Sequence, residues 1–283
     1  MPIQYGLLTK EQLNAVAALL PDVGLTATTG SIYAIGAVKN NYICGVLIFR
    51  ADGELLIDIQ YIAVAEPYRR QGIATGLLDF LCESAWESTT AIFCTFAAAD
   101  WDEPLCRLFI RRGDFTLTEA EGYICRFPCK ELSRIELNTA PPAGTHIATF
   151  YDLPKRVQNR FLNEMKKDNL EFSEGIRAEY EQMLRPLCIC VVDSSENIQA
   201  AFFCQGREHD VELSLAYGTP GHVHALAALL SHLRRLLLSA GDHISYLRIA
   251  AVTPQSRKLV EKLLPEREVM ENFYTACWDM NNI

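Results

Sequence analysis

Residues 61–74 decide the fold of this chain, and they read YIAVAEPYRRQGIA. The β-branched and aromatic residues 61–64 predict a strand that ends before a turn at Pro67. An amphipathic helix is predicted from about Gly72 to Ser88, because apolar residues recur there at helical spacing. The segment is therefore a strand, a tight turn and a helix start.

A loop of this kind suits an anion. The first amides of a helix have no partner inside the helix and point outward at the positive end of its dipole, so they can bind a phosphate. Gly72 and Ala74 are small enough to let a ligand approach, and Arg69 and Arg70 add positive charge. The alternative interpretation is that the small residues only allow close packing and that the arginines are solvated. The segment is neither a P-loop nor a dinucleotide-binding fingerprint, because the required lysine and glycines are missing.

The rest of the chain alternates strands and helices, which predicts a mixed α/β fold. A turn-rich segment, Asn138–Gly144, contains a proline pair and is the one obvious linker. We therefore predict domains at residues 1–137 and 146–283, joined by residues 138–145. The second half repeats the order of elements, and residues 62–67 align without gaps on residues 215–220. This repetition indicates an internal duplication.

The spacing Arg69-x-x-Gly72-x-Ala74, after a strand that ends in Ala-Val-x-x-Pro, resembles the Q/R-x-x-G-x-G/A signature of the GNAT superfamily. The resemblance implies two tandem GNAT-like domains, each with a mostly antiparallel central sheet flanked by helices, and acetyl-CoA as co-substrate. It also implies two groups of cofactor-binding residues. The strand that contacts pantetheine contains Ile62, Ala63 and Val64, and the loop that holds the pyrophosphate contains Arg69, Arg70, Gln71, Gly72, Ile73, Ala74 and Thr75.

The same resemblance suggests where catalytic groups belong. Asp58 lies where several family members place a glutamate that deprotonates the amine, so it is the candidate general base. Strand alternation predicts that Asp58 shares a face with Gln60, Ile62 and Val64; the alternative is an ordinary solvated carboxylate. A second helix of the first half is predicted over residues 102–112, and it has Phe109 at the position of the family's tyrosine acid. Asp102, at the position of the family's asparagine, is expected to be the N-cap of that helix.

The second half serves as an internal control. Its loop has His222, Val223 and His224 where the first half has Arg69, Arg70 and Gln71, and Ala225 replaces Gly72. Together with Val260 at the tyrosine position, this predicts that only the first half binds acyl-CoA. His222 and His224 are expected to be surface or cap residues rather than metal ligands.

Two functions from different classes follow. The first is an N-acyltransferase that moves an acetyl group from acetyl-CoA to the amine of a small molecule or peptide. The alternative is a non-catalytic acyl-CoA-binding or sensing protein, since Phe109 removes the expected acid. A third possibility is an aminoacyltransferase, which need not keep an intact CoA loop.

Composition excludes other classes. The net charge of −9, without a long basic stretch, argues against nucleic-acid binding. No apolar run approaches the length of a membrane span, and the N-terminus lacks the pattern of a signal peptide, so a cytoplasmic protein is expected. We expect it to be a monomer or a homodimer. The ten cysteines mostly lie in apolar patterns and are predicted to be core thiols, with no metal site.

Overall fold

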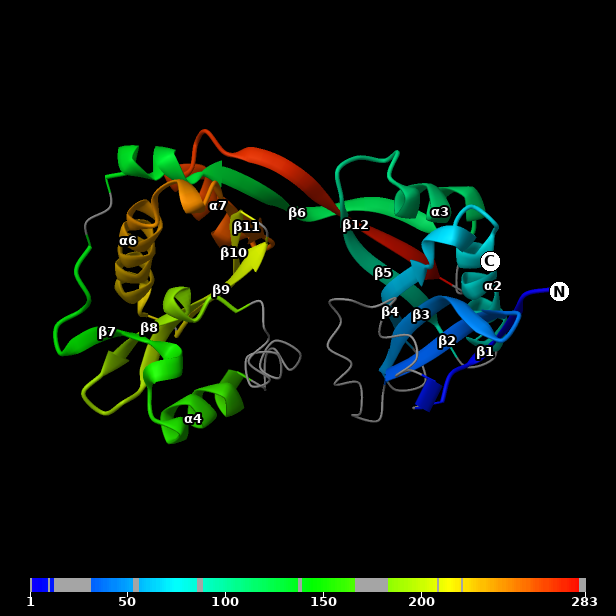
Figure 1. Cartoon of the computed structure of the whole chain (residues 1–283), viewed down its shortest axis with the longest axis horizontal. Helices are drawn as coiled ribbons and strands as arrows, with labels where there is room; N and C mark the ends of the chain where they lie inside the picture. Colours follow the sequence, from blue (N-terminus) through cyan, green and yellow to red (C-terminus); the bar gives the residue numbers. More distant parts are fainter. Residues whose placement is uncertain are drawn as a thin grey trace. The chain divides into compact units, whose positions relative to one another are not determined.

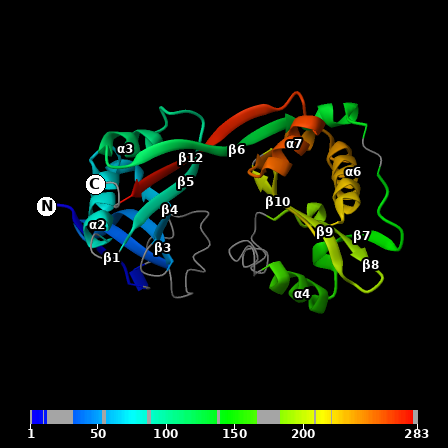
Figure 2. The same ribbon diagram turned by 180° about the vertical axis from the view of Figure 1, so that it is seen from behind.

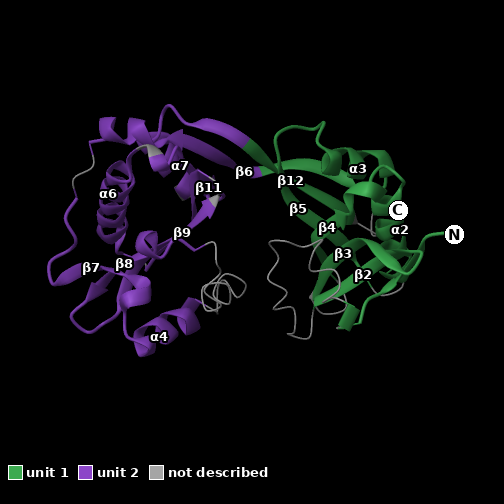
Figure 3. Cartoon of the chain, viewed as in Figure 1, with its two compact units in different colours: residues 1–120, 271–283 green, residues 121–270 purple. Residues whose placement is uncertain are grey.

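The computed structural model describes residues 2–9, 11–12, 32–52, 56–85, 89–136, 139–165, 183–207, 209–219 and 221–279. They divide into two compact units (Figure 3). Unit 1 comprises residues 1–120 and 271–283, and unit 2 comprises residues 121–270. The amphipathic pattern of residues 10–20 predicts a helix, and this segment lies almost entirely outside the described residues.

Unit 1 is built on a mixed sheet with the order β1-β2-β3-β4-β5-β12 (Figure 1). Neighbouring strands are antiparallel except β4 and β5, which are parallel. The prediction of a mixed, mostly antiparallel sheet is therefore confirmed. The strands are β1 (Gln4–Leu7), β2 (Ile32–Lys39), β3 (Tyr42–Asp52), β4 (Leu56–Val64), β5 (Ala91–Ala98) and β12 (Glu268–Asp279).

Two helices share the apolar core of unit 1. Helix α2 (Ile73–Ala85) buries the stripe that its sequence predicts, including Ile73, Leu77 and Leu81. Helix α3 (Pro104–Arg112) contributes the fully buried Phe109 to the same cluster. It ends at Gly113, whose φ of 76° lies in the left-handed region that favours glycine at the end of a helix.

Unit 2 repeats this architecture with the strand order β6-β11-β10-β9-β8-β7, and β10 and β11 are its parallel pair (Figure 1 and Figure 2). Its strands are β6 (Thr116–Pro128), β7 (Thr145–Thr149), β8 (Ile189–Asp193), β9 (Ile198–Arg207), β10 (Asp210–Gly218) and β11 (Tyr246–Ala251). Its helices are α4 (Lys155–Met165), α6 (Val223–Ser239) and α7 (Pro254–Leu263).

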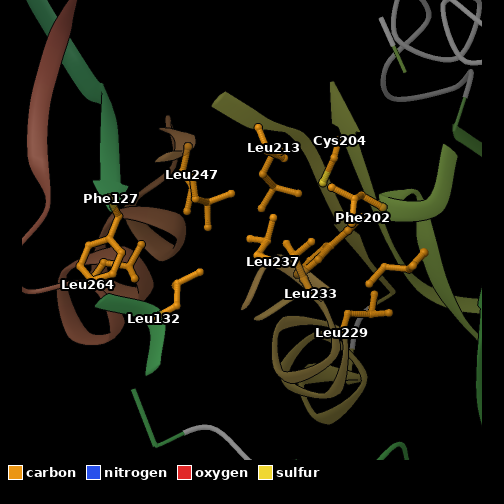
Figure 4. Close-up of a cluster of buried hydrophobic side chains, with 14 of the residues drawn as sticks. Phe127, Leu132, Phe202, Cys204, Leu213, Leu229, Leu233, Leu237, Leu247 and Leu264 are labelled. Atoms are coloured by element: carbon orange, nitrogen blue, oxygen red, sulfur yellow. The ribbon is translucent and has the colours of Figure 1, made fainter. Parts of the chain in front are cut away.

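The largest core of unit 2 lies beneath α6. Leu229, Leu233 and Leu237 recur every four residues and therefore form one stripe along the helix. Figure 4 shows this stripe beside Phe202 and Leu213, which come from β9 and β10. The apolar face of α6 thus packs the helix against β9 and β10.

The last strand of each half lies in the sheet of the other unit. Residues 123–128 of β6 pair with β11 in unit 2, and residues 272–279 of β12 pair with β5 in unit 1. The sequence pattern predicts two strands here, one around Phe115 and one over residues 123–127, whereas the structure has one continuous strand, β6. The compact units therefore differ in extent from the predicted domains 1–137 and 146–283, because hydrophobic periodicity does not tell which sheet a strand will join.

The cysteines are free thiols, and all are buried except the partly exposed Cys277. Their prediction as core residues is confirmed for this set. Burial raises the pKa of Cys82 and of Cys94 to about 12, so both thiols stay protonated at neutral pH.

Candidate functional site

The parallel strands of unit 1 separate halfway along their length. β4 and β5 are in register from Leu56–Ala91 to Asp58–Phe93 and no further, although β4 continues to Val64 and β5 to Ala98. Beyond Asp58, β4 still pairs with β3 on its other side, up to Val64 opposite Gly45. Among the described strands, none pairs with the β5-facing edge of residues 59–64, so backbone groups there can bind an extended ligand.

A β-bulge at Gln60 changes which side chains share a face of β4. Tyr61 pairs with Ile48 and Ile59 pairs with Phe49, so Gln60 is the extra residue. Before the bulge, Ile57 and Ile59 face the core under α2, and after it Ile62 and Val64 do so. The predicted face of Asp58, Gln60, Ile62 and Val64 is therefore wrong: Asp58 and Gln60 lie opposite the two apolar residues. Simple alternation fails because the bulge inserts one residue.

Asp58 stands where the strands part and is held by two neighbours. Its Oδ2 lies 3.5 Å from a guanidinium nitrogen of Arg50, its cross-strand partner on β3. Gln60 Nε2 donates a hydrogen bond to the same carboxylate oxygen. The Asp58 side chain is 19% exposed. A partly buried, oriented carboxylate at this point has the position that a general base needs.

The loop between β4 and α2 presents unused backbone donors. It contains a short 3-10 turn, Glu66–Tyr68, and then two residues with left-handed backbone, Arg70 at φ 61° and Gly72 at φ 79°. Among the described residues, the amides of residues 70–75 donate no backbone hydrogen bond; the first at this end of α2 runs from Gly76 N to Gly72 O over 2.9 Å. A Cβ on Gly72 would meet no atom within 4 Å, so the space in front of the loop is open.

Three side chains brace this loop. Arg69 Nε donates to the carbonyl of Val64, the last residue of β4, over 3.1 Å. Gln71 Nε2 donates to the carbonyl of Pro67 over 3.2 Å. Lys39, at the end of β2, donates from Nζ to Gln71 Oε1 over 3.1 Å. The sequence singled out Arg69 and Gln71, but it gave no signal for Lys39, which is distant along the chain.

Two glycines behind the loop fix the start of α2. A Cβ on Gly45 of β3 would lie 2.7 Å from Ile73 Cγ2, so the first residue of α2 packs directly on the strand backbone. A Cβ on Gly76 would collide with the ring and hydroxyl of Tyr5 from β1. Both glycines act through close approach, which a single sequence does not reveal.

The later helix offers no acid to the site. Phe109 is fully buried, with its ring 5.8 Å from that of Phe96 and 5.0 Å from that of Phe115. The expectation that Asp102 caps α3 is wrong, because the N-cap is Glu103. Asp102 instead lies in the turn before the helix, where its carboxylate forms an ion pair with Arg107 at 3.3 Å.

Unit 2 has a similar pair of separating parallel strands, but the loop that follows them differs from that of unit 1. β10 and β11 lose register after Leu213–Ile249, and Ser214 is bulged because Leu213 pairs with Cys204 and Leu215 with Phe203. Matching the bulges aligns Gln60 with Ser214, one position away from the gapless alignment predicted for residues 62–67. It also puts Glu212 at the position of Asp58.

The loop that follows β10 is half as long as its counterpart, with residues 219–222 against 65–72. Its amides are also partly used, since His222 N donates to Thr219 O over 3.1 Å and Ala225 N donates to His222 O over 3.0 Å. His222 is the N-cap of α6 but makes no side-chain capping bond. This loop has fewer open donors than the loop of unit 1.

Other kinds of site find little support in the described part of the chain. No three His, Cys, Asp or Glu side chains come together there in an arrangement that could hold a metal ion. None of the described helices combines the length and the apolar character needed to cross a lipid bilayer.

Comparison with known proteins agrees with this geometry. Residues 10–113 match the acetyltransferase (GNAT) family. A tandem GNAT protein from the clavulanic acid biosynthesis pathway superposes with a TM-score of 0.63 at 13% identity, over 98% of both chains. A GCN5-related N-acetyltransferase from Sphaerobacter thermophilus gives 0.54 at 12% identity, over 98% of this chain and 95% of that one. No curated protein is significantly similar in sequence. Residues 10–113 therefore match the acetyltransferase (GNAT) family, and the chain as a whole has the fold of a tandem GNAT protein.

Proposed function

We propose that the first half of the chain transfers an acetyl group from acetyl-CoA directly to an amine, and that the second half binds no CoA. The main support is that two features meet at the end of β4. The edge of Ile62–Val64 is open toward β5, where the amides of pantetheine can pair with backbone. The loop amides of residues 70–75 follow immediately and suit a pyrophosphate.

In this proposal the amine nitrogen attacks the thioester carbonyl carbon, the carbon–sulfur bond breaks, and the CoA thiolate leaves. Asp58 accepts the proton that the amine loses, directly or through a water molecule. Its place at the last paired residue of β4 and β5 puts it beside the opening where the thioester would lie. A thiolate whose conjugate acid has a pKa of about 8.5 is a tolerable leaving group and can take its proton from water. The reaction thus does not require a tyrosine at residue 109.

A second function deserves a direct comparison, namely acyl-CoA binding without turnover. It is favoured by Phe109, which is enclosed by aromatic rings and has no proton to give. Such a protein would keep the loop of residues 70–75 and would not need Asp58 as a base.

Calorimetric titration with CoA followed by an acetyl-transfer assay tests these proposals. We expect one CoA site per chain and release of free CoA thiol when acetyl-CoA is mixed with an accepted amine. Two sites per chain would contradict the assignment of the second half. Tight binding with no transfer to a broad panel of primary amines, including peptide N-termini, would favour the binding function.

A further inference from the structure

The turn between β2 and β3 reaches the candidate CoA loop. Asn40 and Asn41 have φ values of 53° and 64°, the left-handed pair that a two-residue hairpin turn requires, and Lys39 precedes them. Next to the turn, Cys44 is bulged, because Val38 pairs with Ile43 and Ala37 with Gly45. The Cys44 carbonyl accepts a hydrogen bond from Ala65 N over 2.9 Å, so this end of the hairpin is tied to the start of the loop.

The ammonium group of Lys39 lies against the loop itself. Its Nζ donates to Gln71 Oε1 over 3.1 Å and lies 5.7 Å from the ring centroid of Tyr68. The amide of Gln71 is oriented by its second hydrogen bond, from Nε2 to the Pro67 carbonyl. A lysine at the end of β2 is thereby held against the side chains of Gln71 and Tyr68, which belong to the loop that carries the open amides.

The charge of this region is not neutralised within the described chain. No salt bridge between described residues involves Lys39, Arg69 or Arg70. Arg69 is turned toward the Val64 carbonyl and therefore back toward β4. Burial raises the pKa of the nearby Cys44 thiol, and the positive charge of Lys39 opposes that rise. The loop with the open backbone donors thus carries two arginines and has the Lys39 ammonium group against it, and this excess of positive charge suits an anion with more than one charge.

We propose that Lys39 binds the pyrophosphate of CoA together with the amides of residues 70–75, and that Gln71 holds the ammonium group in place. This inference rests on the proposed function, because it names a further ligand for the same co-substrate. It adds to the loop a residue from a different part of the sheet, 32 positions away from Gln71 in the sequence.

The test is a calorimetric comparison of CoA and dephospho-CoA binding to the full-length chain. We expect Lys39→Met to weaken CoA binding about 10-fold or more, as for loss of a hydrogen bond to a charged group. Lys39→Arg keeps the charge and should stay within about 3-fold of the wild type, since guanidinium also binds phosphate. Lys258→Met, which removes an exposed lysine of α7 in unit 2, is the matched control and should change nothing. The melting temperature of each variant checks folding.

The two ligands and the salt concentration decide what Lys39 contacts. The loss of affinity in Lys39→Met should be equal for CoA and dephospho-CoA, because both ligands keep the pyrophosphate. This loss should become smaller as the salt concentration is raised. Unaltered affinity of Lys39→Met would overturn the inference. So would a loss seen only with CoA, which would assign Lys39 to the 3′-phosphate, or a loss that salt does not change, which would assign it to loop packing. Failure of the wild-type chain to bind either ligand would instead refute the proposed function.

Discussion

Gly72 has a backbone φ of 79° and open space at the position of a missing Cβ. Close packing within the described protein therefore does not require a glycine at this position. Its left-handed backbone and the open space in front of it are the two features that favour glycine here. The alternative interpretation in which Gly72 serves helix packing applies instead to Gly45 and Gly76, where a side chain would collide with neighbours. This difference leaves the space at Gly72 open for the proposed contact with CoA.

Gly72→Val should abolish most CoA binding, because the side chain would occupy the space in front of the loop amides. Gly113 provides the control: its φ is 76° and its Cβ position is also open, but it ends α3. Each substitution should lower the free energy of unfolding by about 1–2 kcal/mol through left-handed strain. We expect calorimetry to show at least a 10-fold weaker affinity for Gly72→Val, an estimate of about 1.4 kcal/mol or more, and wild-type affinity for Gly113→Val. Equal affinities in the two variants would remove Gly72 from the site.

Asp58→Asn should lower kcat by roughly 10²–10⁴-fold while CoA affinity stays unchanged, because the base acts on the amine and not on CoA. Arg50→Gln is the matched variant, since it breaks the same ion pair but keeps the carboxylate. Asp102→Asn, at an exposed carboxylate before α3, should be neutral. Steady-state rates across pH distinguish these cases. If Asp58→Asn keeps full activity at every pH, the Asp58–Arg50 pair is structural.

How far the sequence reaches can be judged from the same residues. The candidate loop of residues 69–75 could be singled out because its residues are consecutive in the chain, and the fold class followed from the order of the elements. The face of Asp58 could not, because the bulge at Gln60 arises from the pairing of β3 with β4. Lys39 could not either, since its contact with Gln71 depends on how a hairpin turn lies in three dimensions.

At the scale of elements, the site depends on how α2 is seated on the sheet. Its first residue, Ile73, packs on the backbone of Gly45, and Gly45 pairs with Val64 at the end of β4. The start of the helix and the end of the strand are thus fixed by one contact, and the loop amides between them are oriented as a consequence. Unit 2 has the strands and the helix, but its connecting residues 219–222 are too few to form a similar loop.

Gly45→Ala should destabilise unit 1 by about 1–3 kcal/mol, because the new methyl group would overlap Ile73. CoA affinity should fall with it as α2 shifts. The double variant Gly45→Ala with Ile73→Ala should recover part of the affinity, since the smaller side chain makes room. Gly6→Ala, where no atom lies within 4 Å, is the control. Denaturant unfolding and CoA titration measure both effects, and strictly additive changes in the double variant would contradict this coupling.

At the scale of the whole molecule, the decisive feature is that β12 belongs to the sheet of unit 1. Tyr274, Ala276 and Trp278 are buried there, and Thr95 Oγ1 on β5 lies 3.0 Å from Thr275 Oγ1. Unit 1 is therefore assembled from two segments of the chain, residues 1–120 and 271–283.

A chain that ends at Met270 should lose CoA binding, although the whole candidate loop is present. Removing a buried tryptophan or comparable aromatic side chain costs about 3–5 kcal/mol, and β12 contributes two such residues to a unit with a total stability of about 5–15 kcal/mol. Thermal unfolding and CoA titration measure the loss. Deletion of residues 280–283 alone leaves β12 intact and should have no effect. Addition of a synthetic peptide of residues 268–283 should restore binding, and retained affinity without it would show that β12 is dispensable.

The exchange of last strands also imposes an order on biosynthesis. A ribosome adds about 5–20 residues per second, so roughly 10–35 s pass between the release of β5 and that of β12. During this interval the partner edge of β5 and the apolar residues beside it stay uncovered, a condition that invites aggregation and binding by chaperones. The nascent first half must wait until β12 has been synthesised, and a polypeptide that stops before β12 lacks the strand that pairs with β5.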